Sequence, residues 1–284
     1  MLIGTLLAIA SALSWGSSVV SAARASRRIG GLSTILWVYA LGIALIGPIA
    51  LAHGLPHVSR AVWLWTLVTV LCALGGLASV YAGIGYGKVG LVAAISSMQG
   101  AVAVVYSLIG GASLAAVGFA GVAITMAGMF AATLAPDHDD GSIEDRRPGR
   151  AIAFGLAASL LQGGALYASV RAAEVGADWT IFLTRVAAVA AAIPLIAAGR
   201  LRSPRPALGF VLFCAVAEIC GFAAYILAAD RIGIPVAAVI ASQFAAVAAV
   251  IGYLALGERL SRRQVAGIVT IIAGVTLLTL TSGS

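Results

Sequence analysis

The sequence predicts an all-α integral membrane protein with ten transmembrane helices, arranged as two inverted five-helix repeats. Three observations lead to this fold class: the composition, the lengths of the apolar runs, and an internal repeat. Of the 284 residues, 62% are hydrophobic and 10% are charged, whereas a soluble domain carries about 25% charged residues. This composition excludes a soluble enzyme, a nucleic-acid binder and a disordered protein. The net charge is +7, but the basic residues flank apolar runs and do not form a stripe on one polar face, as they would in a nucleic-acid binder.

Ten apolar runs approach or exceed the length of about 20 residues that a helix needs to cross the hydrocarbon core. Short polar segments separate the runs. The first run lacks the basic segment and cleavage site of a signal peptide, so we expect it to remain as a transmembrane helix. The predicted helices span residues 2–22, 32–52, 62–86, 90–109, 113–134, 151–172, 178–198, 206–229, 234–255 and 264–281.

A single polar linker divides the chain. It runs from Pro136 to Arg150 and is rich in charged residues. We therefore expect a first five-helix repeat in residues 1–135, a cytoplasmic linker in 136–150 and a second five-helix repeat in 151–284.

The two halves resemble each other in sequence. A shift of 147 residues places Trp15-Gly16 on Gln162-Gly163 and Arg24 on Arg171. A shift of 144 places Tyr81 on Tyr225 and Gln99 on Gln243, and a shift of 146 places Gly121 and Gly128 on Gly267 and Gly274. Because each repeat holds an odd number of helices, the second copy must enter the membrane from the opposite side.

The basic residues in the short loops predict the orientation. The loops after the odd-numbered helices hold 13 Lys and Arg residues, and the loops on the other face hold 3. This imbalance puts the odd-numbered loops in the cytoplasm and both termini outside the cell, in an inner membrane.

One segment resembles a known family of transporters. The chain reads Leu256-Gly257-Glu258-Arg259-Leu260-Ser261, followed by Gln264, Gly267 and Gly274. This resembles the signature of EamA-type carriers in the drug/metabolite transporter superfamily. Ser14-Trp15-Gly16 is similar to the family's first helix, and Arg185 matches an arginine early in the second helix of a repeat.

The resemblance covers the whole chain and implies a carrier of small metabolites. The chain departs from the family in three ways. The helix proline of the family, about fourteen residues before the glutamate, falls near Phe244 in this sequence. The first half reads Ile109-Gly110-Gly111-Ala112 where a Gly-Glu-Arg element would be expected. In addition, the family usually has cytoplasmic termini, whereas the loop charges predict external ones. We interpret Glu258 and Arg259 as an interfacial ion pair or cap.

Two ionisable residues lie deep in predicted helices, where a charge costs about 2.5–3.5 kcal/mol. Glu218 falls near the membrane midplane. We expect it to be a proton-binding group, a partner for a substrate ammonium, or a structural carboxyl. Arg185 lies about 6 Å from it in depth, estimated from the helix rise. The two residues are therefore expected to form a salt bridge or to hold the two poles of a zwitterion.

Gln99, Gln162 and Gln243 also fall near mid-depth. They either line a cavity or hydrogen-bond to neighbouring helices. Trp15 would supply an apolar wall with an N–H donor, or simply pack in the core. The glycine pairs Gly121/Gly128 and Gly267/Gly274 are spaced by two helical turns and predict close helix packing.

No pattern predicts a cofactor, a metal site, an ATP-binding site or a catalytic triad. Cys72, Cys214 and Cys220 lie in apolar runs without the spacing of a metal or redox motif. His53 and His57 are expected in a loop. The leading hypothesis is therefore a secondary carrier for amino acids or similar amphipathic compounds, with protons as a candidate coupling ion. The alternatives are a flippase for a lipid-linked carrier and a membrane scaffold without transport activity.

Overall fold

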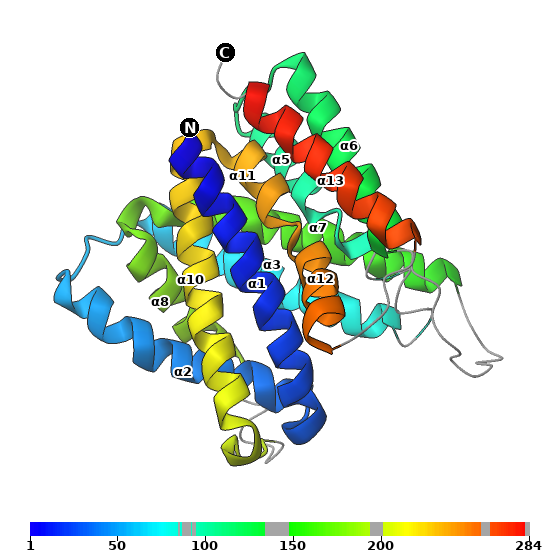
Figure 1. Cartoon of the computed structure of the whole chain (residues 1–284). Coiled ribbons are helices and arrows are strands. Elements are labelled where there is room, and N and C mark those ends of the chain that lie inside the picture. The colour runs from blue at the N-terminus through cyan, green and yellow to red at the C-terminus, as the bar shows by residue number, and fades with distance from the viewer. Residues whose placement is uncertain are drawn as a thin grey trace.

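The chain forms a helical bundle in which α1 begins and α13 ends at the same end of the molecule (Figure 1). The computed structural model describes residues 1–84, 86, 92, 95–133, 148–193, 201–256 and 262–281, and no strand occurs in these ranges. The first half contains α1 (Leu2–Ile29), α2 (Gly31–Ala52), α3 (Arg60–Ile84), α5 (Gln99–Ile109) and α6 (Ala116–Thr133). The second half contains α7 (Pro148–Ala172), η1 (Ala173–Val175), α8 (Ala177–Ala191), η2 (Arg205–Ala207), α10 (Leu208–Ile232), α11 (Ile234–Ala241), α12 (Phe244–Leu256) and α13 (Arg262–Thr281).

Each of the ten predicted runs contains helix in the described part of the chain, as the fold class requires. Among the described residues, five helices are long and apolar enough to cross a membrane: Leu2–Ile29, Gly31–Ala52, Arg60–Val80, Gly149–Val175 and Arg205–Ile232. Shorter apolar helices cover Gln99–Ile109, Ala116–Ala131, Ile234–Ala248 and Val265–Leu278. The linker from Pro136 to Arg150 lies largely outside the described residues, as do Glu258 and Arg259.

Large apolar side chains cover the outside of the bundle, and small residues fill much of its interior. Leu71, Val269 and Ile272 are each about 60% exposed. Alanine and serine are frequent among the buried residues. This arrangement suits a lipid environment, where helices associate through close packing of small residues because lipid is as apolar as leucine.

Helix α1 extends beyond its predicted end at residue 22, to Ile29. The extra turns carry Arg24, Arg27 and Arg28, all of which are exposed. Charged residues end an apolar run without ending a helix, because arginine is a good helix former. The helix stops at Gly30, whose φ of 84° suits glycine.

The predicted helices 90–109 and 234–255 are both interrupted. Residues 97–98 and 242–243 form turns, and α5 and α12 begin immediately after them. At each break a backbone N–H bonds three residues back, from Met98 to Ile95 and from Gln243 to Ile240. The two breaks lie against each other, since a Cβ on Gly100 would be 2.9 Å from the Cβ of Ser242.

The predicted glycine packing is confirmed, and it joins the two halves. A Cβ on Gly128 would lie 2.8 Å from the carbonyl oxygen of Gly267, and one on Gly121 would lie 3.2 Å from that of Gly274. Helices α6 and α13 therefore run antiparallel in close contact, and they lie side by side in Figure 1. Equivalent helices that pack antiparallel are what an inverted repeat produces.

The structure corrects the repeat register in the broken helices by one residue. Gly16 of α1 approaches the carbonyl of Phe244, and its equivalent Gly163 of α7 approaches the carbonyl of Gln99. Gln99 therefore corresponds to Phe244 and not to Gln243. The equivalent breaks are related by a shift of 145 residues, and not by the shift of 144 that the two glutamines suggested.

Candidate functional site

Glu218 lies near the middle of the apolar span Arg205–Ile232, in α10. The hydroxyl of Ser18 in α1 donates a hydrogen bond to Glu218 Oε1 at 2.9 Å. Ser18 is 3% exposed, and its carbonyl accepts a contact from Cys214 Sγ at 3.4 Å. A carboxyl at the predicted midplane is thus held at the interface of α1 and α10, a tightly packed helix pair.

Arg185 comes to the same region from α8 and is 5% exposed. Its stem lies across Gly42 of α2, where a Cβ would be 2.7 Å from both Cδ and Nε of the arginine. Its guanidinium carbon is 5.5 Å from the centre of the Tyr39 ring. The buried arginine therefore packs against a glycine and a tyrosine that lie one turn apart on α2.

Arg185 and Glu218 do not form the direct salt bridge that depth alone suggested. Within the described ranges the one ion pair joins His53 to Asp178. Glu218 is nevertheless within electrostatic reach of Arg185. Two atoms of Arg185, Nε and Nη2, are buried without a hydrogen-bond partner. The role of the two residues as separate poles for a zwitterion stays a prediction. We call Ser18, Tyr39, Gly42, Arg185 and Glu218 the charged site.

Trp15 lies one turn along α1 from Ser18, in an aromatic cluster. Its ring centroid is 5.9 Å from those of Phe222 and Tyr225 and 6.5 Å from that of Phe244. Gly221 of α10 accommodates the indole, because a Cβ there would be 2.7 Å from Trp15 Cδ1. Trp15 is 8% exposed and belongs to the hydrophobic core beside the charged site, so its position agrees with core packing, and its role as the wall of a cavity stays a prediction.

The three glutamines occupy different places. Gln243 sits at the break between α11 and α12, where its Nε2 donates to the Val239 carbonyl at 2.8 Å and its Oε1 is buried without a partner. Gln99 begins α5 and is 6% exposed. Gln162 packs on α3, where a Cβ on Gly76 would be 2.6 Å from its Cγ. Gln162 and Trp15 are equivalent positions in the two repeats, and the proposed role of the glutamines in lining a cavity stays a prediction.

Two cavities open at opposite ends of α10. One, of about 580 Å³, is lined by Ser17, Ser21, Arg24, Arg28, Arg205 and Phe210, among others. The other, of about 550 Å³, includes Tyr167, Arg171 and the segment from Ile232 to Val236. The repeat relates Arg24 of the first cavity to Arg171 of the second. Each lies over an aromatic ring, Arg24 at 5.9 Å from that of Phe210 and Arg171 at 5.8 Å from that of Trp65. Glu218 lies along α10 between the two cavities.

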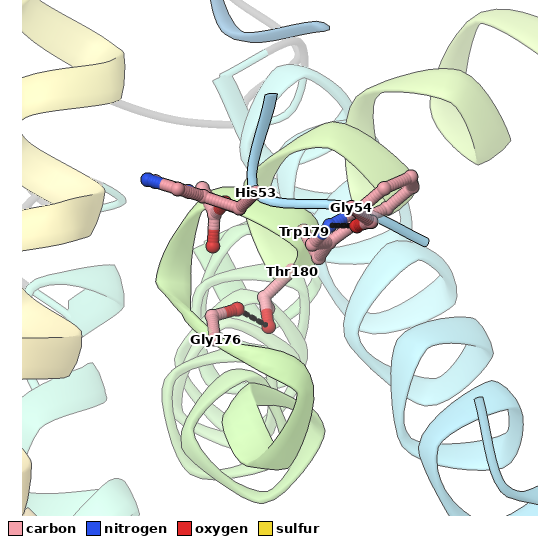
Figure 2. A network of polar contacts seen from close by, with 6 residues as sticks. His53, Gly54, Gly176, Trp179 and Thr180 are labelled. Atoms are coloured by element: carbon pink, nitrogen blue, oxygen red, sulfur yellow. Dashed lines mark hydrogen bonds and ion pairs between the residues drawn. The ribbon is translucent and has the colours of Figure 1, made fainter. Parts of the chain in front are cut away.

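A second polar cluster ties α2 to α8 at the end of α10 away from Arg205. His53 Nδ1 lies 2.7 Å from Asp178 Oδ2, and Trp179 Nε1 donates to the Gly54 carbonyl at 3.0 Å. Figure 2 shows the Trp179–Gly54 bond beside that of Thr180 to the Gly176 carbonyl. Gly176 adopts a φ of 97°, which lets the chain turn between η1 and α8. His53 thus lies at the end of α2, as a partner for an acidic side chain.

Sequence reasoning missed Ser18, Tyr39 and Gly42. One signal was available for Ser18: α1 carries serines at positions 11, 14, 18 and 21, a spacing of three and four residues that places them on one helical face. No comparable signal marks Tyr39 and Gly42, because their role depends on how α2 packs against Arg185.

The comparisons with known proteins agree with this architecture. The model of the EamA-like transporter family matches residues 2–134 and again residues 149–280. A solved structure, titled only as the crystal structure of a protein, has a TM-score of 0.77 and 16% sequence identity, and the match covers 99% of this chain and 97% of that chain. At this identity the likeness shows a shared fold. None of the curated proteins compared matches the chain.

Proposed function

Because the chain belongs to the EamA-like transporter family of the drug/metabolite transporter superfamily, we propose that it is a secondary active carrier of small metabolites. Family membership makes it a multi-pass membrane transporter and not an enzyme. Amino acids or related amphipathic compounds are the proposed substrates. Alternating access of the two inverted repeats is the proposed mechanism.

The observation that carries this proposal is the position of Glu218. It lies on α10 between the cavities at the two ends of this helix, and it accepts a hydrogen bond from Ser18 on α1. Burying a charged carboxyl in apolar surroundings costs free energy, and ionisable residues at such positions in membrane proteins usually mark functional sites. Placed between two openings, it can take up a proton from one side and release it to the other when the helices rearrange.

The repeat supports alternating access in a second way. Helices α1 and α10 form one tight pair, and their equivalents α7 and α3 form the other. The broken helices and the α6–α13 contact lie between the two halves. If each helix pair adopted the arrangement that the other pair now has, one end cavity would open while the other closed. Trp15, Gln99, Gln162 and Gln243 are proposed as the walls of the path.

The cell inner membrane is the proposed location, with both termini outside because of the loop charges. The linker is proposed to be a cytoplasmic tether. Since the cost of loop closure changes slowly with length and does not depend on acidic residues, a Gly/Ser segment of equal length from Asp137 to Glu144 should leave transport within a few-fold of the parent. Loss of transport in a variant that still reaches the membrane would give the linker an active role.

One observation favours a flippase as the second candidate. The cavity beside Arg24, Arg28 and Arg205 has three basic side chains and no carboxylate among the residues that line it, which suits the phosphate of a lipid-linked substrate. These arginines are exposed at the end of the bundle, whereas the charged site at the predicted midplane has one arginine beside a glutamate. That difference leaves the metabolite carrier as the first proposal.

Reconstituted protein tests the proposal directly. Purified carrier in proteoliposomes should accumulate at least one labelled compound from a panel of amino acids and vitamins when a pH gradient is imposed. The accumulation should disappear when a protonophore collapses the gradient. Movement of a fluorescent lipid-linked phosphate between leaflets, without uptake of any panel compound, would favour the flippase. Absence of both activities in folded protein would favour a scaffold.

A further inference from the structure

The cavity at the Arg205 end of α10 is basic. The residues that line it include Arg24 and Arg28 from α1 and Arg205 from η2, and no described lining residue carries a carboxylate. None of the three arginines forms an ion pair with a described residue. The next carboxylate along α10, that of Glu218, lies eight residues beyond Phe210, about 12 Å away by the helix rise. The described surroundings therefore do not neutralise this end of the bundle.

Packing brings two of these charges together. The guanidinium carbons of Arg24 and Arg28 lie 5.9 and 4.8 Å from the centre of the same ring, that of Phe210. Arg28 Nη1 also donates to the Pro206 carbonyl at 2.9 Å. The ring attracts both cations, but like charges four residues apart on a helix repel each other. An anion bound between them would remove this repulsion.

An apolar surface continues from the basic one within the same cavity. Leu208 and Phe213 line it and are 48% and 50% exposed, and Val20 and Ile251 line it as well. Gly209 leaves space there, since a Cβ on it would meet no described atom within 4 Å. The cavity, which we call the basic groove, thus has a cationic part and an apolar part.

The basic groove lies where a membrane lipid has its headgroup. Arg205 begins the apolar span that ends at Ile232, so it marks the level at which this span leaves the hydrocarbon core. The loop charges predict that this end faces the cytoplasm, and the cytoplasmic leaflet carries anionic lipids that basic pockets between transmembrane helices bind. A soluble anion would contact the arginines alone, whereas a phospholipid would cover both parts of the groove.

We infer that an anionic phospholipid of the surrounding bilayer occupies the basic groove. Its phosphate contacts Arg24, Arg28 and Arg205, and an acyl chain follows Leu208 and Phe213. The lipid remains bound as a component of the folded protein and is not carried across the membrane, which distinguishes it from the substrate of a flippase. Because it contacts α1 of the first repeat and both η2 and α10 of the second, it stabilises the contact between the two halves.

Lipid titration of the purified full chain tests the inference. Protein in nonionic detergent is mixed with phosphatidylglycerol, with phosphatidylcholine, or with glycerol 3-phosphate, which carries the phosphate without acyl chains. Binding is measured by native mass spectrometry and by the shift in thermal unfolding. Phosphatidylglycerol should bind about tenfold more tightly than either other probe and should raise the melting temperature.

Variants locate the bound lipid. Arg24→Gln and Arg28→Gln should each weaken phosphatidylglycerol binding about fivefold, because each removes one charge from the basic groove. Arg27→Gln is the matched control, since Arg27 is an exposed arginine of the same helix that does not line the cavity. Gly209→Leu leaves every arginine in place and fills the apolar part, so it should also weaken binding. A cooperative melting transition checks that each variant is folded.

Four results would overturn the inference. Equal losses in Arg27→Gln and Arg24→Gln would show attraction to the general charge of this end and not to the groove. Unchanged binding in folded Gly209→Leu, or glycerol 3-phosphate that binds as tightly as phosphatidylglycerol, would assign the arginines to a phosphate without acyl chains. Movement of fluorescent phosphatidylglycerol between leaflets of proteoliposomes, lost in Arg24→Gln, would make the lipid a substrate. No binding result depends on metabolite uptake, so the carrier proposal stands or falls separately.

Discussion

The Ser18 hydroxyl donates a hydrogen bond of 2.9 Å to Glu218 across the interface of α1 and α10. The bond links a buried serine of the first repeat to a carboxyl of the second. It gives the carboxyl a fixed orientation between the two end cavities and makes it sensitive to movement of α1. The proposed coupling therefore depends on a contact between repeats and not on Glu218 alone.

Replacement of Ser18 by alanine should impair coupling without unfolding the protein. The change removes the bond to Glu218 and leaves a side chain that fits the space, so the loss of stability should stay within about 1.5–3 kcal/mol. We expect pH-driven accumulation in proteoliposomes to fall several-fold. Ser169→Ala is the control, since Ser169 is equally buried but bonds to the Leu166 carbonyl of its own helix. Equal effects of the two substitutions would argue against a role for the Ser18 bond.

The close contact between α6 and α13 predicts that a larger residue at Gly128 lowers the stability of the protein. In Gly128→Ala the new methyl would lie 2.7 Å from the Ile271 nitrogen and 2.8 Å from the Gly267 oxygen. Because both are backbone atoms, the helices must separate, at a cost of about 1–3 kcal/mol. Gly209→Ala meets nothing within 4 Å and should be neutral or slightly stabilising. Thermal unfolding in detergent measures both variants, and equal melting temperatures would contradict the packing account.

In the cluster between α2 and α8, we expect the apolar contacts to contribute more to stability than the ion pair. Asp178→Asn should change stability by less than about 1 kcal/mol, because the His53 side chain is 67% exposed. Trp179→Ala should cost about 3–5 kcal/mol, since the indole is 7% exposed and packs with Ala50 and Leu183. Thermal unfolding distinguishes them. A larger effect from Asp178→Asn would show that the ion pair contributes more than its exposure implies.

Much of the fold could be predicted from apolar run length and the repeat, but the helix breaks could not. The run 234–255 is apolar except for Ser242, Gln243 and Tyr253, and neither Ser242 nor Gln243 is a helix breaker like proline. The turn there packs against Gly100 of the other repeat, so tertiary contacts create it. The one-residue error in register has the same origin, because Gln99 and Gln243 are alike in chemistry but Gln99 follows its turn whereas Gln243 lies within its turn.

The candidate site was predictable in part. Glu218 and Arg185 stand out because charges are rare in apolar runs, and the structure brings them to one region. Their partners were hidden, because a serine, a tyrosine and a glycine are ordinary residues of a transmembrane helix. Only the packing of α2 on α8 shows that Gly42 makes room for Arg185.

The loop charges predict that both termini lie outside the cell. In a variant without Cys72, Cys214 and Cys220, a single cysteine introduced by Ser284→Cys should react with an impermeant maleimide on intact cells. One introduced by Asp139→Cys should react only after the cells are permeabilised. The reverse pattern would show that the usual orientation of the family prevails over the local charges.

The central claim, that Glu218 couples protons to transport, is tested most directly by Glu218→Gln in proteoliposomes. Glutamine keeps the shape and the hydrogen-bonding capacity of the side chain but cannot titrate. The account predicts that the variant inserts and folds, exchanges substrate across the membrane, and no longer accumulates it when a pH gradient is imposed. If the glutamine variant still concentrates substrate with unchanged pH dependence, Glu218 is structural and the proposed coupling is wrong.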